Sequence, residues 1–300
     1  MTEKRKVTFK SRGIDIVGDL HLPSKSSPDR KGAAIIVGHP GTGIKEQASG
    51  LYARLLAEAG FTTLAFDAAY QGESGGEPRD IEDPYQRVED FKCAVTYLSA
   101  LGEGVDAQRI GLAGICASGG YGIFAAQTDV RIKAVAGVAL MCTGTMARAA
   151  FQDESGNISP EALHASLAPM GQARIAEANG AEGMTISILD YGGAGEYYST
   201  PLGYHPRCTN KQLARSFELL LNYDSFAFIK WLAPRPLLLI VGTEPMKAFD
   251  TIPFSKTAYE NACDPKELFV VQGRKHIDFY HETSESLPKL VEFFGKALCD

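Results

Sequence analysis

The sequence lacks a long apolar run, an excess of positive charge and any closely spaced pair of cysteines. No stretch is long and apolar enough to span a bilayer, and the charged start of the chain (MTEKRK) is not followed by an apolar segment, so we expect neither a membrane span nor a secretion signal. The formal net charge of −6 leaves no general basic surface for nucleic acid. These absences predict a cytoplasmic protein without a membrane or nucleic-acid partner.

The six cysteines are scattered, without a CxxC motif or a Cys/His ligand spacing. This pattern is typical of free thiols in a reducing compartment and predicts neither a disulfide framework nor a zinc site. The loop at residues 38–45 misses the phosphate-binding P-loop pattern by one residue, and it lacks the third glycine of a dinucleotide fingerprint. We therefore expect no metal and no cofactor.

What the sequence does contain is an alternation of strand and helix patterns. With 300 residues and 45% hydrophobic content, the chain can bury a large core and fits a single domain over residues 1–300. Continuous apolar runs indicate strands covered on both faces, and helical patterns lie between them. The alternation predicts an α/β protein with a mostly parallel, eight-stranded sheet and helices on both faces. The predicted strands are 6–10, 15–22, 33–37, 62–66, 110–113, 134–140, 236–241 and 268–271, and the predicted helices between them are 45–59, 83–101, 119–127, 254–262 and 285–297.

Residues 143–232 interrupt this alternation, because they contain no buried-strand pattern. They have helical patterns at 160–178 and 211–221 and a Gly/Tyr-rich loop at 191–198 (YGGAGEYY). An insertion between two strands, at the end where open α/β sheets bind ligands, predicts a helical cap over a site. We expect Tyr70, Tyr197 and Tyr198 to contact a substrate there.

Residues 114–120 (GICASGG) lie where a buried strand meets a run of small residues that opens a helix. In one large class of enzymes such a sharp turn carries the nucleophile. Here Cys116 stands at the tip, where the positive end of the helix dipole and a nearby histidine would favour its thiolate. Two alternatives remain open: Cys116 is an inert buried residue, or Ser118 is the nucleophile. The strand length favours Cys116, because the serine frame places the turn two residues beyond the strand.

A general base and a carboxylate would complete this chemistry. His276 follows the strand at 268–271 by a short loop, so we expect it at the same sheet edge as Cys116, acting as the base. Glu244 lies just past the strand at 236–241 and is the first candidate to orient the histidine. Asp250, six residues further along the same loop, is the second candidate, and both carboxylates could instead be solvated loop charges.

Chemistry at a carbonyl also needs N–H donors for the developing oxyanion. The backbone N–H of Ala117, directly after the cysteine, supplies one donor. The loop after the strand at 33–37 reads GHPGTG, and its glycines allow the backbone to turn N–H groups inward. We expect Gly41 to supply the second donor, with Thr42 behind it.

These motifs make the chain similar to the α/β-hydrolase superfamily over nearly its whole length. The matching pieces are the GHPG loop, the segment 67–76 (DAAYQGESGG), the turn at Cys116 and the GRKH segment at 273–276. The chain resembles the cysteine-nucleophile group that includes dienelactone hydrolases, and in motif it is closest to fungal polyketide thiohydrolases and acyltransferases and to bacterial hydrolases of unassigned substrate. It departs from the usual pattern at Ser118, where the turn mostly ends in glycine, and at Glu244, where aspartate is more common.

Three functional hypotheses follow from the residues and the resemblance. The first is a hydrolase that acts on an ester, thioester or lactone through a Cys–His–acid triad and an acyl-enzyme intermediate. The second is an acyltransferase that passes the acyl group to an alcohol or amine; a polyketide presented by an acyl carrier protein is one such source. The third is a non-enzymatic protein that binds a small apolar ligand. The sequence leaves the oligomeric state open, a homodimer included.

Overall fold

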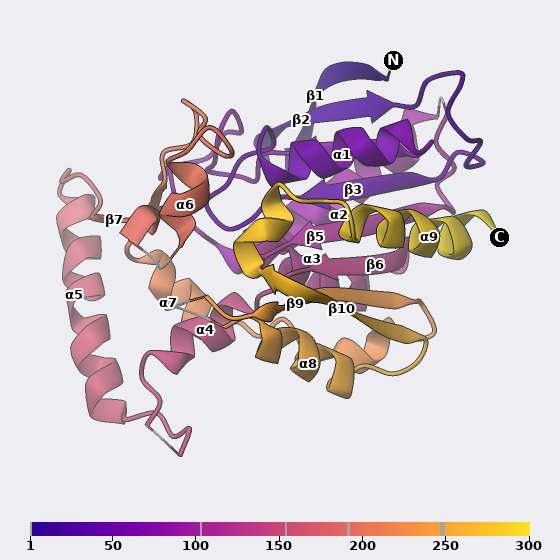
Figure 1. The fold of residues 1–300 in the computed structure, drawn as a ribbon. Helices are drawn as coiled ribbons and strands as arrows, with labels where there is room; N and C mark the ends of the chain where they lie inside the picture. Colours follow the sequence, from indigo (N-terminus) through magenta and orange to yellow (C-terminus); the bar gives the residue numbers. More distant parts are fainter. Residues whose placement is uncertain (1, 103, 154, 191–192, 247–249) are drawn as a thin grey trace.

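The computed structural model describes residues 2–102, 104–153, 155–190, 193–246 and 250–300, and its centre is an eight-stranded sheet (Figure 1). The strand order is β1-β2-β4-β3-β5-β6-β9-β10. The pairs β1/β2 and β2/β4 are antiparallel, and the other neighbouring pairs are parallel, so the predicted mostly parallel sheet is confirmed. The strands are β1 (Glu3–Ser11), β2 (Ile14–Leu22), β3 (Ala34–Gly38), β4 (Thr62–Phe66), β5 (Ile110–Ile115), β6 (Ile132–Val138), β9 (Leu237–Glu244) and β10 (Lys266–Lys275).

The central strands are buried along their whole length. Every residue of β3, β4 and β5 is buried, which explains why these segments are continuous apolar or small-residue runs rather than alternating ones. The edge strand β1 is largely exposed and carries Lys4, Arg5, Lys6 and Lys10. Charges of this kind on an edge strand oppose pairing with another chain.

Helices cover both faces of the sheet, as predicted (Figure 1). On one face, α1 (Ala48–Glu58) packs on β3 and β4, and α9 (Ser286–Cys299) packs on β5 and β6. On the other face, α2 (Pro84–Leu101) packs against α3 (Ala117–Thr128), which lies on β5 and β6; α8 (Ile252–Asn261) packs on β9 and β10. Asp83 sets the start of α2, because its side chain accepts hydrogen bonds from the N–H groups of Tyr85 and Gln86.

Residues 143–232 form the segment between β6 and β9, and Figure 1 shows much of it to one side of the sheet, with α5 at the outer edge. No residue of α5 is buried. The predicted helix at 211–221 is wrong at its start, because residues 211–213 form a strand that pairs with β7, and only the second half is helical. Of the predicted loop at 191–198, Tyr191 and Gly192 lie outside the described residues. The elements are α4 (Thr143–Ala149), α5 (Pro160–Ala178), β7 (Thr185–Ser187), η1 (Ile188–Asp190), α6 (Ala194–Tyr198), β8 (Lys211–Leu213), α7 (Ser216–Leu221) and η2 (Ile229–Leu232).

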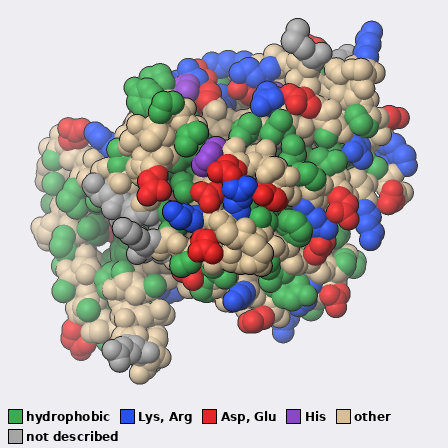
Figure 2. Space-filling model, viewed as in Figure 1, with side chains coloured by type: hydrophobic (Ala, Val, Ile, Leu, Met, Phe, Trp, Pro, Cys, Tyr) green, Lys and Arg blue, Asp and Glu red, His purple; other side chains and the backbone are tan. Residues whose placement is uncertain are grey.

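The surface carries charges of both signs. On the face seen in Figure 2, acidic and basic side chains are interspersed, and no continuous basic stripe crosses it. Among the helices of the described ranges, none combines the length and the apolar character that crossing a membrane requires.

Candidate active site

The turn between β5 and α3 has the geometry expected of a nucleophile elbow. Cys116 has φ 57° and ψ −122°, a backbone conformation that non-glycine residues adopt only where the surroundings enforce it. The turn is so tight that a Cβ on Gly114 would lie 2.1 Å from the backbone oxygen of Ser118, so only glycine fits there. The turn therefore places Cys116 at the N-terminus of α3, directly after the end of β5.

Ser118, the alternative nucleophile, faces away from this tip. Its hydroxyl donates to the backbone oxygen of His39 at 2.5 Å and accepts from the Arg87 guanidinium at 3.1 Å. The residue is 1% exposed. The hydroxyl thus ties α3 to the loop after β3, which favours Cys116 over Ser118 as the attacking residue.

Two backbone N–H groups lie near the thiol. The N–H groups of Ala117 and Gly41 both lower the pKa of Cys116, so the two loops predicted to hold an oxyanion both approach this sulfur. Thr42 lies behind Gly41: it has φ 57°, and its hydroxyl donates to the Gly41 carbonyl at 2.7 Å. Two inward N–H groups at one point can stabilise negative charge on sulfur or on a carbonyl oxygen bound there.

His276 begins the short helix η3 (His276–Tyr280), directly after β10, and is buried. Its Nδ1 lies 3.0 Å from the Thr251 hydroxyl, and its Nε2 lies 2.9 Å from the Tyr280 hydroxyl. The Tyr280 hydroxyl also interacts with the Cys116 thiol, and each group shifts the pKa of the other, so this hydroxyl contacts the imidazole on one side and approaches the thiol on the other. Sequence reasoning missed Tyr280, although its position four residues after His276 places both on one side of a helical turn.

The two candidate carboxylates are exposed and have other partners. Glu244 ends β9, and its carboxylate accepts from the Thr243 hydroxyl at 3.3 Å. Asp250 accepts from the N–H of Ile252 at 2.9 Å, at the start of α8. Within the described ranges, the two ring nitrogens of His276 contact the hydroxyls of Thr251 and Tyr280 rather than either carboxylate. Asp250 directly precedes Thr251 in the chain, and Glu244 is the β9 partner of Lys275, the residue before His276.

Burial sets the charge state of this cluster. It raises the pKa of the Cys116 thiol, although hydrogen bonds from Tyr280, Ala117 and Gly41 oppose the effect. Burial also lowers the pKa of His276 to about 3 and raises that of Tyr280 well above its usual value. At neutral pH these shifts favour the uncharged thiol, phenol and imidazole over a thiolate–imidazolium pair.

The three tyrosines expected to contact substrate are not in equivalent places. Tyr198 is buried, and its environment includes the Cys116 sulfur, which raises the pKa of Tyr198 further beyond the effect of burial. Tyr197 packs edge-on against Tyr280, with ring centroids 5.2 Å apart. Tyr70 instead lies against Gly76, and the acidic groups that raise its pKa, after burial, come from α2 and its cap. Tyr197 and Tyr198 thus approach the thiol from the 143–232 segment, and a substrate contact by Tyr70 stays a prediction.

Comparison with known proteins identifies the family. No protein-family model matches the chain. The uncharacterized protein PA2218 of Pseudomonas aeruginosa is 39% identical over 99% of this chain and 81% of its own length. Its crystal structure superimposes with a TM-score of 0.90 at 37% identity and covers 99% of this chain and 94% of its own. The crystal structure of the α/β-hydrolase GrgF from a Penicillium species has a TM-score of 0.78 at 22% identity and covers 99% of this chain and 100% of its own. The chain has the α/β-hydrolase fold and belongs to one family with PA2218.

Relatives with named activities include fungal enzymes. The acyltransferase drtE of Aspergillus calidoustus is 26% identical to this α/β-hydrolase over 98% of this chain and 96% of its own length. A thiohydrolase of Eupenicillium brefeldianum is 26% identical over 93% of this chain and 89% of its own.

In the described part of this α/β-hydrolase, no group of three or more His, Cys, Asp or Glu side chains is arranged to hold a metal ion.

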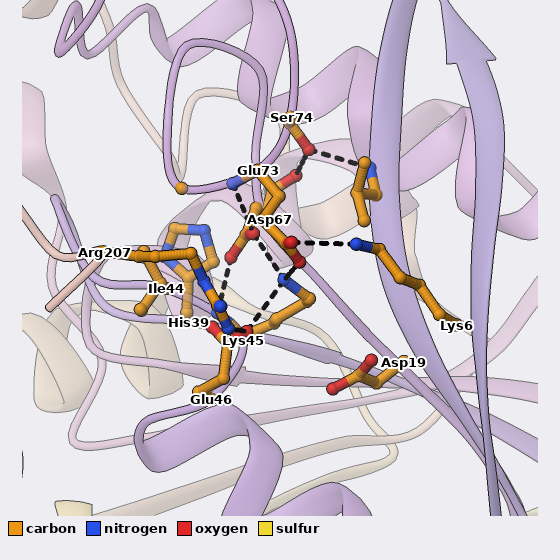
Figure 3. A network of polar contacts seen from close by, with 12 residues as sticks. Lys6, Asp19, His39, Ile44, Lys45, Glu46, Asp67, Glu73, Ser74 and Arg207 are labelled. Carbon is orange, nitrogen blue, oxygen red and sulfur yellow. Dashed lines mark hydrogen bonds and ion pairs between the residues drawn. The ribbon is translucent and has the colours of Figure 1, made fainter. Parts of the chain in front are cut away.

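A buried ion cluster supports the loop that carries Gly41 (Figure 3). The Lys45 side chain is 1% exposed, and its Nζ lies 2.7 Å from Asp67 Oδ2, 2.7 Å from Glu73 Oε2 and 2.9 Å from Glu46 Oε1. The second oxygen of Asp67 accepts from the Lys45 backbone N–H at 2.7 Å. In this α/β-hydrolase, the loops after β3 and β4 are therefore clamped together through one lysine.

The 143–232 segment is attached to the same loop. Arg207 forms an ion pair with Glu46, beside Lys45 (Figure 3). The Cys208 thiol donates to the backbone oxygen of Thr42 at 3.4 Å. These two contacts therefore couple the 143–232 segment to the loop that carries Gly41.

Proposed function

We propose that this α/β-hydrolase cleaves an ester, thioester or lactone through an acyl-enzyme on Cys116. The sulfur attacks the carbonyl carbon while its proton passes to His276, and Gly41 and Ala117 hold the oxygen that becomes negative. The imidazolium then protonates the leaving alkoxide or thiolate. Water hydrolyses the acyl-cysteine, which releases the acid and restores the thiol.

The observation that carries this proposal is the convergence at one sulfur atom. Cys116 is held at a strained turn, two backbone N–H groups and the Tyr280 hydroxyl lie near enough to lower its pKa, and that hydroxyl contacts His276. A packed core cysteine has no need of these four features. Together they match the parts that covalent acyl transfer requires: a nucleophile, a base and donors for an oxyanion.

The orienting acid completes the proposal. Two carboxylates remain candidates, Glu244 and Asp250. The structure favours Asp250, because the adjacent Thr251 already hydrogen-bonds His276 Nδ1. A small rotation at residue 250 would exchange the hydroxyl for a carboxylate; Glu244, which is equally exposed, ends β9.

Acyl transfer to an alcohol or amine is the second candidate, and burial of the thiol favours it. Cys116 is 5% exposed, and the tyrosines of α6 approach it from the 143–232 segment, so this segment would act as a cap that keeps water from the acyl-cysteine. A thioester that water reaches slowly survives to meet another nucleophile. The relative drtE is named as an acyltransferase, which supports the same candidate. An acyl carrier protein would be a natural donor of such a group.

Intact-mass spectrometry after incubation with a panel of acyl thioesters, esters and lactones tests the acyl-enzyme. We expect one added acyl mass on Cys116 in the wild type and none in Cys116→Ala. Cys142→Ala is the matched control, because Cys142 is also a buried free thiol but lies at the start of α4. Equal turnover of every substrate by the wild type and Cys116→Ala would refute the proposal. Adding an alcohol or amine then separates the two activities: a new ester or amide indicates an acyltransferase, and free acid alone indicates a hydrolase.

A further inference from the structure

A tyrosine hydroxyl stands between the proposed nucleophile and its base. The Tyr280 hydroxyl lies 2.9 Å from His276 Nε2, and it is near enough to the Cys116 thiol to lower the pKa of that thiol. Direct proton transfer from sulfur to imidazole would require the phenol to leave this position. The phenol is firmly held, because Tyr280 is 3% exposed and its ring packs edge-on against the rings of Tyr197 and His276, with centroids 5.2 Å and 5.4 Å away.

We propose that Tyr280 is a catalytic residue that relays the proton between Cys116 and His276. This proposal rests on the acyl-enzyme function proposed above. As the sulfur attacks, the S–H proton moves to the Tyr280 oxygen while the phenolic proton moves to His276 Nε2. The products are a thiolate, or an S–C bond to the substrate, together with a neutral phenol and an imidazolium. The phenol is unchanged overall, and the return of the proton to the leaving group reverses the relay.

The hydrogen-bond directions on both sides of the relay are consistent. For Nε2 to accept the phenolic proton, the neutral imidazole must carry its own proton on Nδ1. Thr251 provides an acceptor for that proton at 3.0 Å. The Tyr280 oxygen can then accept the S–H bond while donating to Nε2, so each group in the chain donates once. After transfer, Nε2–H donates to the phenol oxygen and the phenolic O–H donates to the thiolate, while Nδ1–H still donates to the Thr251 hydroxyl.

The charge states in the cluster favour a relay over a standing ion pair. Burial raises the pKa of the Cys116 thiol and lowers that of His276, so separating charge in the resting enzyme is unfavourable. A relay needs no such separation before substrate arrives. The proton leaves the sulfur only as the carbonyl carbon takes up its electrons.

Tyr280→Phe tests the relay, because it removes the hydroxyl and keeps the ring. The primary measurement needs no acyl substrate: the rate of Cys116 alkylation by iodoacetamide as a function of pH, read by peptide mass mapping. We expect the midpoint of the alkylation curve to move to higher pH and the alkylation rate at pH 7 to fall at least about tenfold, since the variant loses a donor to the thiolate and the path to the base. Where acylation is seen in the wild type, it should slow by about 100-fold.

Tyr52→Phe is the matched control. Tyr52 is also a fully buried tyrosine, and its hydroxyl donates to the backbone oxygen of Phe279, next to Tyr280, so it supports η3 without touching the thiol. We expect its alkylation midpoint to equal that of the wild type. An unchanged midpoint or faster alkylation in folded Tyr280→Phe would overturn the relay, the latter by indicating that the phenol only blocks the thiol. An equal shift in both variants would also overturn it, since a merely structural role would then explain the effect. If the wild type forms no acyl adduct, the acyl-enzyme function fails, while the alkylation result still decides the role of Tyr280.

Discussion

Replacing Lys45 by methionine should destabilise the protein strongly, because it leaves buried negative charge without its partner. The Lys45 and Asp67 side chains are 1% and 0% exposed. Methionine fills most of the space of the lysine stem but cannot pair with a carboxylate. Removing one partner from a buried ion pair typically costs about 3–5 kcal/mol. Asp67 keeps two backbone N–H donors, from Lys45 and Glu73, so we expect a loss at the lower end, about 3 kcal/mol in the free energy of unfolding.

The pH dependence of this loss has a definite sign. Burial raises the pKa of Asp67 even with the lysine present, and removal of Lys45 would raise it further. In the variant, the folded state then binds a proton at Asp67 at a pH where the unfolded chain does not. Stability of the variant therefore increases as the pH falls from 7 towards the ordinary pKa of the carboxyl group. The difference between the wild type and Lys45→Met should shrink over that range.

Urea unfolding followed by circular dichroism, at pH 7 and pH 5, measures both effects. Lys6→Met is the matched control, because Lys6 pairs with Glu73 at 2.8 Å but its side chain is 60% exposed. Exposed pairs of this kind contribute about 0–1 kcal/mol. The reasoning is refuted if Lys45→Met costs no more than Lys6→Met at pH 7, or if its cost grows as the pH is lowered.

Two further variants test the elbow and the acid. Gly114→Ala puts a Cβ 2.1 Å from the Ser118 backbone oxygen, so we expect the free energy of unfolding in urea to fall by at least about 2 kcal/mol and Cys116 to be alkylated more slowly. The control is Gly171→Ala, in exposed α5, where no atom lies within 4 Å of the added Cβ; it should not lower the free energy of unfolding. For the acid, Asp250→Asn should slow acylation of Cys116 by about 100-fold and more than Glu244→Gln, since Asp250 adjoins the residue that bonds the imidazole. The opposite order would assign the role to Glu244.

The fold could be predicted from the sequence because its signals are local. The six strands from β3 to β10 that belong to the large sheet are visible as apolar runs, since strands buried on both faces admit few polar residues, and the helices between them are visible as periodic patterns. The elbow at residues 114–120 was visible for a similar reason, because a turn this tight restricts its own residue types. The error at 211–213 has the same origin: a three-residue strand is too short to have a period, and its pairing with β7 depends on residues far away in the chain.

The sequence by itself determined the sheet, the position of Cys116 at its turn, and a histidine at the same sheet edge. Only the tertiary structure decided which atoms meet there. The orientation of the Ser118 hydroxyl towards His39, the phenol of Tyr280 between sulfur and imidazole, and the Lys45 clamp behind the Gly41 loop all depend on rotamers and on contacts between distant segments. The burial that keeps the thiol and the imidazole uncharged is likewise a property of the packed molecule, because desolvation is imposed by every neighbour at once and is not carried by any one residue.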